Sequence, residues 1–171
     1  MSDTCCPLRS PAPLPAVLVG SRLDYCNAVL YGANKTTLSR LQRIQNNLAR
    51  VVLQVPRRTH ALSLMQQLHW LPVEHGITYK TALLTYKVHA QSSPAYLHSL
   101  LTSRSFSRTL RLSKTSKFVQ PRVRTVIASR SFCVAAPVVW NSLPHTVVTL
   151  TSVYVFKSHL KTHLFNIAFK Q

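Results

Sequence analysis

Acidic residues are almost absent from this sequence. Its 171 residues include 21 lysines and arginines but only three acids, Asp3, Asp24 and Glu74. Hydrolases and polymerases use carboxylates as bases, nucleophiles or metal ligands. Three acids scattered over the chain provide no pair of carboxylates for such a site, so we predict that the protein is not an enzyme.

Cysteine and glycine are also scarce. The four cysteines, Cys5, Cys6, Cys26 and Cys133, have the spacing of neither a zinc ribbon nor a zinc finger. With no cysteine-rich framework and no signal peptide, the chain is expected in a reducing intracellular compartment. Cys26 and Cys133 lie in apolar stretches and are expected to be buried. Three glycines leave no Gly-rich loop that could cradle a phosphate.

Neither a metal site nor a membrane span is indicated. His159 and His163 lie one helical turn apart, but no glutamate lies between them and no third ligand is evident. We therefore expect no metal and no cofactor. The longest apolar run, at residues 14–19, is far shorter than the roughly 20 residues that cross a bilayer, so we expect no membrane partner.

What the sequence has in excess is positive charge. The formal net charge is +18, and a compact domain that carries such a charge is destabilised by self-repulsion. A bound polyanion removes this repulsion and releases counterions, so the charge favours RNA or DNA as the partner. The alternative is a fragment whose acidic complement lies on a separate partner domain. The basic charge also favours the nucleus over the cytoplasm as the location.

The apolar pattern predicts a mostly α-helical fold. Hydrophobic residues make up 46% of the chain, enough to bury a core. Four prolines predict a disordered leader over residues 1–16, and apolar spacings of three and four residues then predict a helical bundle over residues 17–101. Its helices are expected at residues 17–31, 35–55, 59–68, 72–90 and 94–101.

The second part of the chain differs from the first in composition and apolar spacing. Residues 102–117 are rich in serine, threonine and arginine and predict a basic loop. Partial alternation predicts a small β-like insert at 118–128, and proline-punctuated residues 131–144 predict a buried turn region. A last helix, capped by Thr151 or Ser152, is expected to pack on the bundle. Its core face would carry Phe156, Leu160, Leu164 and Ile167.

The helix at 35–55 carries a basic stripe beside its apolar stripe. Leu38, Leu41, Gln45, Leu48, Val52 and Val55 form the apolar stripe. Arg40, Arg43 and Arg50 follow the same rhythm on another face, together with Asn47. No glutamate alternates with them, so they are candidates for phosphate contact. The alternative is an ordinary solvated helix face.

A second basic group is denser and lies later in the chain. It consists of Arg104, Arg108, Arg111, Lys114, Lys117, Arg122 and Arg124. Arginine binds phosphate through two hydrogen bonds, and the interspersed Phe106 and Phe118 could stack on unpaired bases. The alternatives are a basic linker and a localisation signal. Trp70 and Trp140 lie among Leu and Val and are expected in the core.

Six phrases in a fixed order carry a resemblance to a known family. They are SRLDYCNAVLYG at 21–32, LSRLQRIQNNLARVV at 38–52, LHWLP at 68–72, PAYLHSLL at 94–101, SFCVAAPVVWNSLP at 131–144 and FKSHLKTHLF at 156–165. Together they resemble the segment that follows the reverse-transcriptase domain in LINE-type, non-long-terminal-repeat retrotransposons of the jockey and chicken-repeat kind. The match covers residues 17–169, and residues 1–16 lie outside it.

The resemblance implies an accessory segment without activity of its own, close to the polymerase thumb, that contacts template RNA or target DNA. The chain has no Asp-Asp pair of the kind that holds the metal ions of a reverse transcriptase. It departs from the family at Ala128-Ser129-Arg130, where a glycine is usual, which affects the local turn. A second hypothesis is a protein-interaction module that packs on a polymerase thumb. A third is a retroelement fragment without function.

Overall fold

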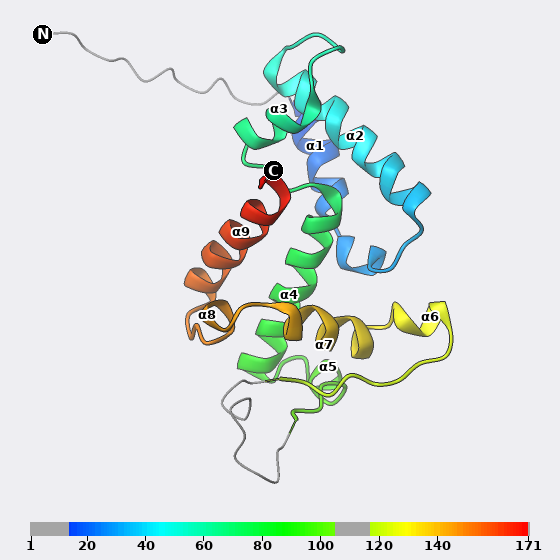
Figure 1. Cartoon of the computed structure of the whole chain (residues 1–171), viewed down its shortest axis with the longest axis vertical. Coiled ribbons are helices and arrows are strands. Elements are labelled where there is room, and N and C mark those ends of the chain that lie inside the picture. The colour runs from blue at the N-terminus through cyan, green and yellow to red at the C-terminus, as the bar shows by residue number, and fades with distance from the viewer. Residues whose placement is uncertain (1–13, 105–116, 171) are drawn as a thin grey trace, which may run out of the picture.

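The chain is described by a computed structural model over residues 14–104 and 117–170, with the backbone alone for residues 14–17. These residues form nine α-helices and one 3-10 helix, so the predicted mostly α-helical bundle is confirmed. Figure 1 shows the long helix α4 in the middle, with α9 along one side of it and α1 and α2 along the other. Helix α7 packs on α4 as well, and α3 packs on α2.

The first part of the chain contains most of the predicted helices. The elements are α1 (Leu14–Asp24), η1 (Asn27–Leu30), α2 (Lys35–Leu53), α3 (Ala61–Gln67), α4 (Val73–Gln91) and α5 (Ala95–His98). The predicted helix at 17–31 is wrong in its second half, because Cys26 adopts a left-handed backbone with φ of 54° and the chain restarts as η1. Most of the predicted leader lies outside the described residues, but residues 14–16 already belong to α1.

Helix α2 is the element that the sequence defines best. Its start is fixed by Asn34, whose side-chain oxygen accepts a hydrogen bond of 2.9 Å from the amide of Thr36. It ends at Leu53, where Gln54 adopts a left-handed backbone. Leu48 and Ala49 are buried against α1 and α3, so the apolar stripe faces the bundle.

Helix α4 is buried on several sides. Ile77, Ala82, Tyr86 and Val88 are all less than 5% exposed. The two buried threonines on α4 satisfy their hydroxyls within the helix: Thr81 donates to the carbonyl of Ile77 at 2.9 Å, and Thr85 donates to that of Thr81 at 2.8 Å. Helix α4 is the central element on which η1, α7 and α9 are arranged.

The second part of the chain is also helical. The elements are α6 (Val126–Ser129), α7 (Phe132–Ser142), α8 (His145–Val148) and α9 (Val153–Phe169). The prediction of a turn region at 131–144 is wrong, because α7 continues through Pro137. A proline inside a helix removes one hydrogen bond. Here Ala136, Val139 and Trp140 are buried against α4, and their burial outweighs that loss.

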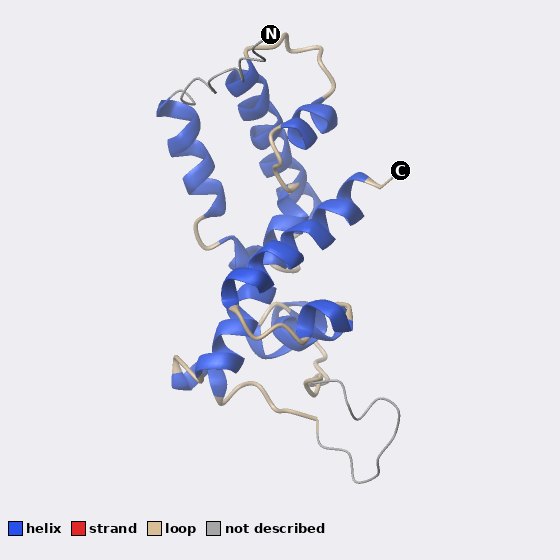
Figure 2. Cartoon of the chain, turned by 90° about the vertical axis from the view of Figure 1, so that its left-hand side faces the viewer, coloured by secondary structure: helices blue, strands red, loops and turns tan. Residues whose placement is uncertain are grey.

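The predicted β-like insert at 118–128 is also wrong. Within the described residues Figure 2 shows helices and loops but no strand. The pairing there is a single antiparallel bridge between Ser103 and Phe118. Residues 119–125 are irregular, and Val126 already begins α6. Pro121 cannot donate to a ladder, so the partial alternation of apolar residues has no pairing to stabilise it.

Helix α9 matches its prediction in all but the last turn. Ser152 stands at its N-cap, and Phe156, Leu160 and Leu164 are buried. Ile167, however, is 52% exposed. The end of α9 leaves α4 and approaches α3, where Phe169 packs against the cluster of Leu64, Met65 and Leu68. The buried face therefore turns away from Ile167.

Two hydrophobic clusters hold the helices together. The larger joins α4, α7, α8 and α9 and includes Trp140, which is 2% exposed, as predicted. The smaller joins α2 and α3, and the partly buried Trp70 packs against it. The expected burial of the cysteines is wrong for Cys26, which is exposed, and Cys133 is only half-buried.

Candidate nucleic-acid interface

Two arginines of α2 point to solvent from the face opposite the core. Arg40 and Arg43 are exposed, whereas Leu48 and Ala49 on the other side of the helix are buried. Helix α2 lies at the edge of the molecule, with no helix beyond it (Figure 1). The outer face of α2 is therefore open to a ligand as large as a nucleic acid.

Arg50, the third arginine of the predicted stripe, is held by the protein itself. Its Nε and Nη2 donate to the carbonyl oxygen of Thr59 at 3.3 and 3.2 Å. Its Nη1 donates to the side-chain oxygen of Asn47 at 3.1 Å. The guanidinium thus ties the end of α2 to the loop before α3. That loop carries two exposed arginines that sequence reasoning missed, Arg57 and Arg58.

The second basic group lies at the other end of the molecule. The amide of Arg104 donates to the carbonyl of Lys117 at 2.9 Å, and the amide of Val119 donates to that of Thr102 at 2.8 Å. These bonds hold the exposed Arg104 beside the half-buried Lys117. Figures 1 and 2 show this point far from α2 along the long axis of the molecule. The structure therefore does not bring the two predicted groups together.

Several predicted residues of this second group lie outside the described residues, and one lies in the core. Arg108, Arg111, Lys114 and the accompanying Phe106 lie outside the described residues. Phe118 is 3% exposed and packs on Trp140, with ring centroids 5.8 Å apart, so it is a core residue and not a stacking platform. Arg122 and Arg124 are exposed on the irregular segment that leads to α6.

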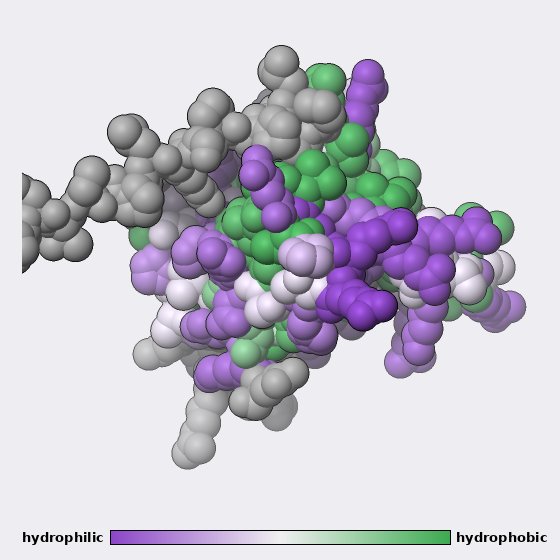
Figure 3. Space-filling view, turned by 90° about the horizontal axis from the view of Figure 1, so that it is seen from above, coloured by the Kyte–Doolittle hydropathy of each residue, from purple (hydrophilic) through white to green (hydrophobic). Residues whose placement is uncertain are grey.

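The acidic side chains of the described residues are too few to balance the cations. Asp24 and Glu74 are the two carboxylates within this part of the chain. Seen from above in Figure 3, hydrophilic side chains lie beside a hydrophobic area at the end of the molecule. An anionic ligand therefore meets few repelling carboxylates on the described part of the chain.

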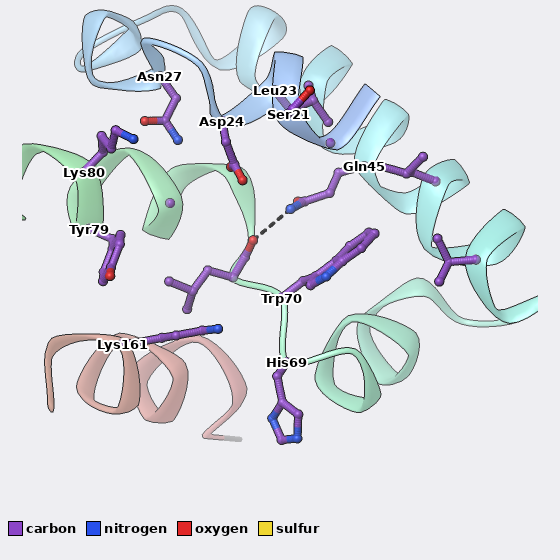
Figure 4. Close-up of a pocket in the computed structure, with 15 residues that line it drawn as sticks. Ser21, Leu23, Asp24, Asn27, Gln45, His69, Trp70, Tyr79, Lys80 and Lys161 are labelled. Carbon is purple, nitrogen blue, oxygen red and sulfur yellow. Dashed lines mark hydrogen bonds between the residues drawn. The ribbon is translucent and has the colours of Figure 1, made fainter. Parts of the chain in front are cut away.

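A cavity of about 530 Å³ opens between α1, α2, α4 and α9. Asp24, Asn27, Trp70, Tyr79, Lys80 and Lys161 are among its lining residues (Figure 4). The side-chain amide of Gln45 crosses it and donates to the carbonyl of Leu71 at 2.9 Å. Burial raises the pKa of the Tyr79 hydroxyl above its ordinary value, so Tyr79 is a neutral wall residue.

Metal-binding and membrane-spanning features are absent from the part of the chain that the structure describes. There, no three histidine, cysteine, aspartate or glutamate residues cluster in a way that could hold a metal ion. His159 is exposed and His163 is half-buried on α9. Over the same residues, the helices lack the combination of length and apolar character that a bilayer crossing demands.

Comparisons with family models, curated proteins and solved structures give no match to this chain. The resemblance to the segment after a retrotransposon reverse transcriptase therefore stays a prediction from the six phrases of the sequence. What the structure adds is the placement of the cations: two separate basic surfaces and a polar-rimmed cavity, all on a helical framework.

Proposed function

We propose that the protein is a non-catalytic accessory segment, derived from a retrotransposon reverse transcriptase, that binds RNA or DNA through phosphate contacts. The observation that carries this proposal is the exposure of arginines without acidic neighbours. Arg40 and Arg43 occupy the solvent face of α2, where an ordinary surface helix mixes the two signs of charge. The net charge of +18 also favours a nucleic-acid partner.

The chemistry of such binding follows from the guanidinium group. Arginine presents a rigid fork of N–H donors that matches two phosphate oxygens, and each phosphate contact releases condensed counterions. Phosphate contacts carry no base information, so the binding would be independent of sequence. Arg57 and Arg58 extend the α2 surface toward α3, and they join Arg40 and Arg43 as contacts in this proposal.

The separation of the two basic surfaces constrains the ligand. A strand that contacts both α2 and the Arg104–Lys117 region has to run along the long axis of the molecule (Figure 1). A short oligonucleotide would engage one surface only. Affinity should therefore rise with oligonucleotide length until both surfaces are occupied, and then level off.

The second candidate function is protein interaction with a polymerase thumb. It is favoured by exposed apolar residues at one side of the molecule: Val126 and Ile127 on α6 are 71% and 81% exposed, and Val29 on η1 is 78% exposed. The residues that follow these two short helices lie close together, since a Cβ at Gly32 would lie 3.0 Å from the Arg130 side chain. Exposed apolar residues of this kind are common at protein interfaces.

A salt series separates the two functions. The purified chain is titrated against labelled single-stranded RNA and duplex DNA between about 50 and 200 mM salt, with circular dichroism recorded at each end. Phosphate binding predicts a linear fall of log affinity with log salt, with a slope of about −0.7 for each contact on a single strand. Affinity that does not change with salt contradicts the proposal.

The same samples test the alternative by sedimentation. Self-association that persists at high salt, in a chain that binds neither RNA nor DNA, would favour the protein-interaction module. Dissociation to a monomer at every salt concentration, together with salt-dependent RNA binding, would support the nucleic-acid function.

A further inference from the structure

The cavity between α1, α2, α4 and α9 has no role in the phosphate surfaces described above. Its walls come from segments far apart in the sequence: Asn27 from η1, Trp70 from the loop after α3, Lys80 from α4 and Lys161 from α9 (Figure 4). Its volume of about 530 Å³ lies within the range of small-molecule sites in proteins. All of its lining residues belong to the described part of the chain.

Asn27 is the residue that indicates a ligand site in this cavity. Its side chain is 7% exposed, and within the described residues its amide oxygen has no hydrogen-bond partner. A buried polar group without a partner is destabilising, so its retention calls for an explanation. Asn27 lies against Gly76 of α4: a Cβ at that position would be 3.7 Å from the Asn27 amide nitrogen, an ordinary contact distance.

The amide of Asn27 has the polarity that recognises a nucleobase. It offers one acceptor and two donor hydrogens, which can pair with the donor–acceptor pattern on the edge of a base. Figure 4 shows this amide directed toward the space between α4 and the Asp24 carboxylate. Asp24 is exposed and adds a second acceptor that an exocyclic amino group or a ribose hydroxyl could use.

Trp70 supplies an aromatic wall. Part of its indole packs against the core cluster of Leu64, Met65 and Leu68, which fixes the ring. The indole also lines the cavity, so it is partly exposed there. A fixed aromatic ring beside a hydrogen-bonding amide is the arrangement that proteins use to hold a single unstacked base.

Two lysines supply positive charge to the cavity. Lys80 and Lys161 are exposed, line the cavity from different helices and outnumber the one lining carboxylate. An ammonium group binds phosphate as a point charge. A purely apolar ligand would leave Asn27 and both lysines unused, so the lining favours a ligand that combines an aromatic ring with an anion.

We propose that this cavity binds one nucleotide, with its base between Trp70 and Asn27 and its phosphate at Lys80 or Lys161, which lie on opposite sides of α4 (Figure 4). The inference rests on the proposed nucleic-acid function in one respect: the nucleotide is expected to belong to a strand held on the basic surfaces. The same chemistry would also accept a free mononucleotide. The experiment below separates the two sources.

The first arm uses mononucleotides. AMP and UMP are added to the full chain while tryptophan emission is recorded, with ribose 5-phosphate as the ligand that lacks a base. Trp140 is 2% exposed, so quenching reports on Trp70. We expect AMP and UMP to quench the tryptophan emission and ribose 5-phosphate to leave it unchanged. Equal responses to all three compounds would show phosphate binding only and would overturn the nucleotide site.

Variants locate the binding. Asn27→Leu keeps the approximate size of the side chain, removes its hydrogen bonds and should weaken AMP binding by about tenfold. The double variant Lys80→Gln and Lys161→Gln changes exposed residues only, so it carries the test even if Asn27→Leu fails to fold. Lys157→Gln, on the same helix as Lys161 but outside the cavity, is the matched control. If neither the double variant nor a folded Asn27→Leu weakens AMP binding, the proposal is wrong.

The second arm uses an RNA hairpin with one bulged nucleotide and the same hairpin fully paired. A nucleotide site predicts tighter binding of the bulged hairpin, and this preference should disappear in the lysine double variant. Salt-dependent binding of both hairpins without preference, and without AMP binding, would reject the cavity and leave the phosphate surfaces standing. AMP binding without binding of any RNA would support the cavity as a site for free nucleotide and reject the nucleic-acid function.

Discussion

The side-chain amide of Asn141 pairs with the backbone of Phe118 through two hydrogen bonds. The Phe118 amide donates to the Asn141 oxygen at 3.0 Å, and the Asn141 nitrogen donates to the Phe118 carbonyl at 2.9 Å. Asn141 lies on α7, and Phe118 follows the predicted basic loop directly after Lys117. One end of the basic segment is therefore anchored to the helical core by a side chain.

Removal of this anchor should destabilise the protein. Asn141→Ala leaves the backbone donor and acceptor of the buried Phe118 without these partners, so we expect the free energy of unfolding to fall by about 1–3 kcal/mol. Urea denaturation measures this change. Amide hydrogen exchange gives the local readout, since the Phe118 amide should exchange faster. The exposed Asn166→Ala on α9 is the control, with a change within about 0.5 kcal/mol. Unchanged protection of Phe118 would contradict the anchoring role.

The contact between α4 and α9 should be the most sensitive part of the core. Tyr86 stacks on Phe156 with ring centroids 4.2 Å apart, and its hydroxyl donates to the carbonyl of Thr151 at 2.6 Å. Phe156 is fully buried, so Phe156→Ala should cost about 3–5 kcal/mol, and Tyr86→Phe should cost about 1 kcal/mol for the lost hydrogen bond. Thermal and urea denaturation measure both changes. Tyr154→Ala, 82% exposed on the same helix, should change stability by less than about 0.5 kcal/mol.

Stability should fall below pH 6.5. Burial lowers the pKa of His75 below its ordinary value of 6.5, although Glu74 acts in the opposite direction. Burial also lowers the pKa of His89, whose ring lies 5.3 Å from that of Phe118, and His98 lowers it further. Between the folded and unfolded pKa values the unfolded chain binds more protons, so acid favours unfolding. The contribution is fully present above pH 6.5 and is lost as the pH falls through the lowered folded pKa values.

Urea midpoints at several pH values between about 7.5 and 5 test this linkage. His75→Leu removes one titrating group and should therefore flatten the fall in stability toward low pH. His145→Leu replaces an exposed histidine on α8 and should leave the slope as it is in the unaltered chain. The same slope in all three proteins would show that burial of His75 does not set the pH dependence.

The sequence predicts helices well where one periodic stripe decides the structure. In α2 the apolar spacing, the Asn34 cap and the exposed arginines all agree, and the helix forms within two residues of its predicted limits. In α7 the local sequence is misleading, because Pro137 is typical of a turn. The helix is stabilised instead by the burial of Val139 and Trp140 on α4. Tertiary packing of this kind leaves no mark on local spacing.

The candidate site could also be predicted only where local periodicity decides the position of a residue. Exposure of Arg40 and Arg43 follows from helical periodicity. Capture of Arg50 by the Thr59 carbonyl depends on where the chain turns after α2, which periodicity does not specify. The cavity of Asn27 was missed entirely, because its walls come from segments that meet only in the folded bundle.

The arginines of α2 should separate into two kinds by experiment. Arg40→Gln with Arg43→Gln removes two exposed charges for which the described part of the chain shows no side-chain hydrogen bond. We expect weaker RNA binding, a salt slope reduced by about 1.4 for two lost single-strand contacts, and unfolding within about 0.5 kcal/mol of the unaltered chain. Arg50→Gln removes the same type of charge but also the hydrogen bonds to Thr59 and Asn47.

For Arg50→Gln we expect the reverse pattern. The partly buried carbonyl of Thr59 loses its charged donor, so the free energy of unfolding should fall by about 1.5–3 kcal/mol, while RNA affinity measured on folded protein changes little. Filter binding across a salt series and urea denaturation of the same samples give both quantities. If the two substitutions weaken RNA binding equally per charge, Arg50 contacts phosphate despite its internal bonds. If neither changes the salt slope, the outer face of α2 is an ordinary solvated surface, and the interface has to be sought at the Arg104–Lys117 end of the molecule.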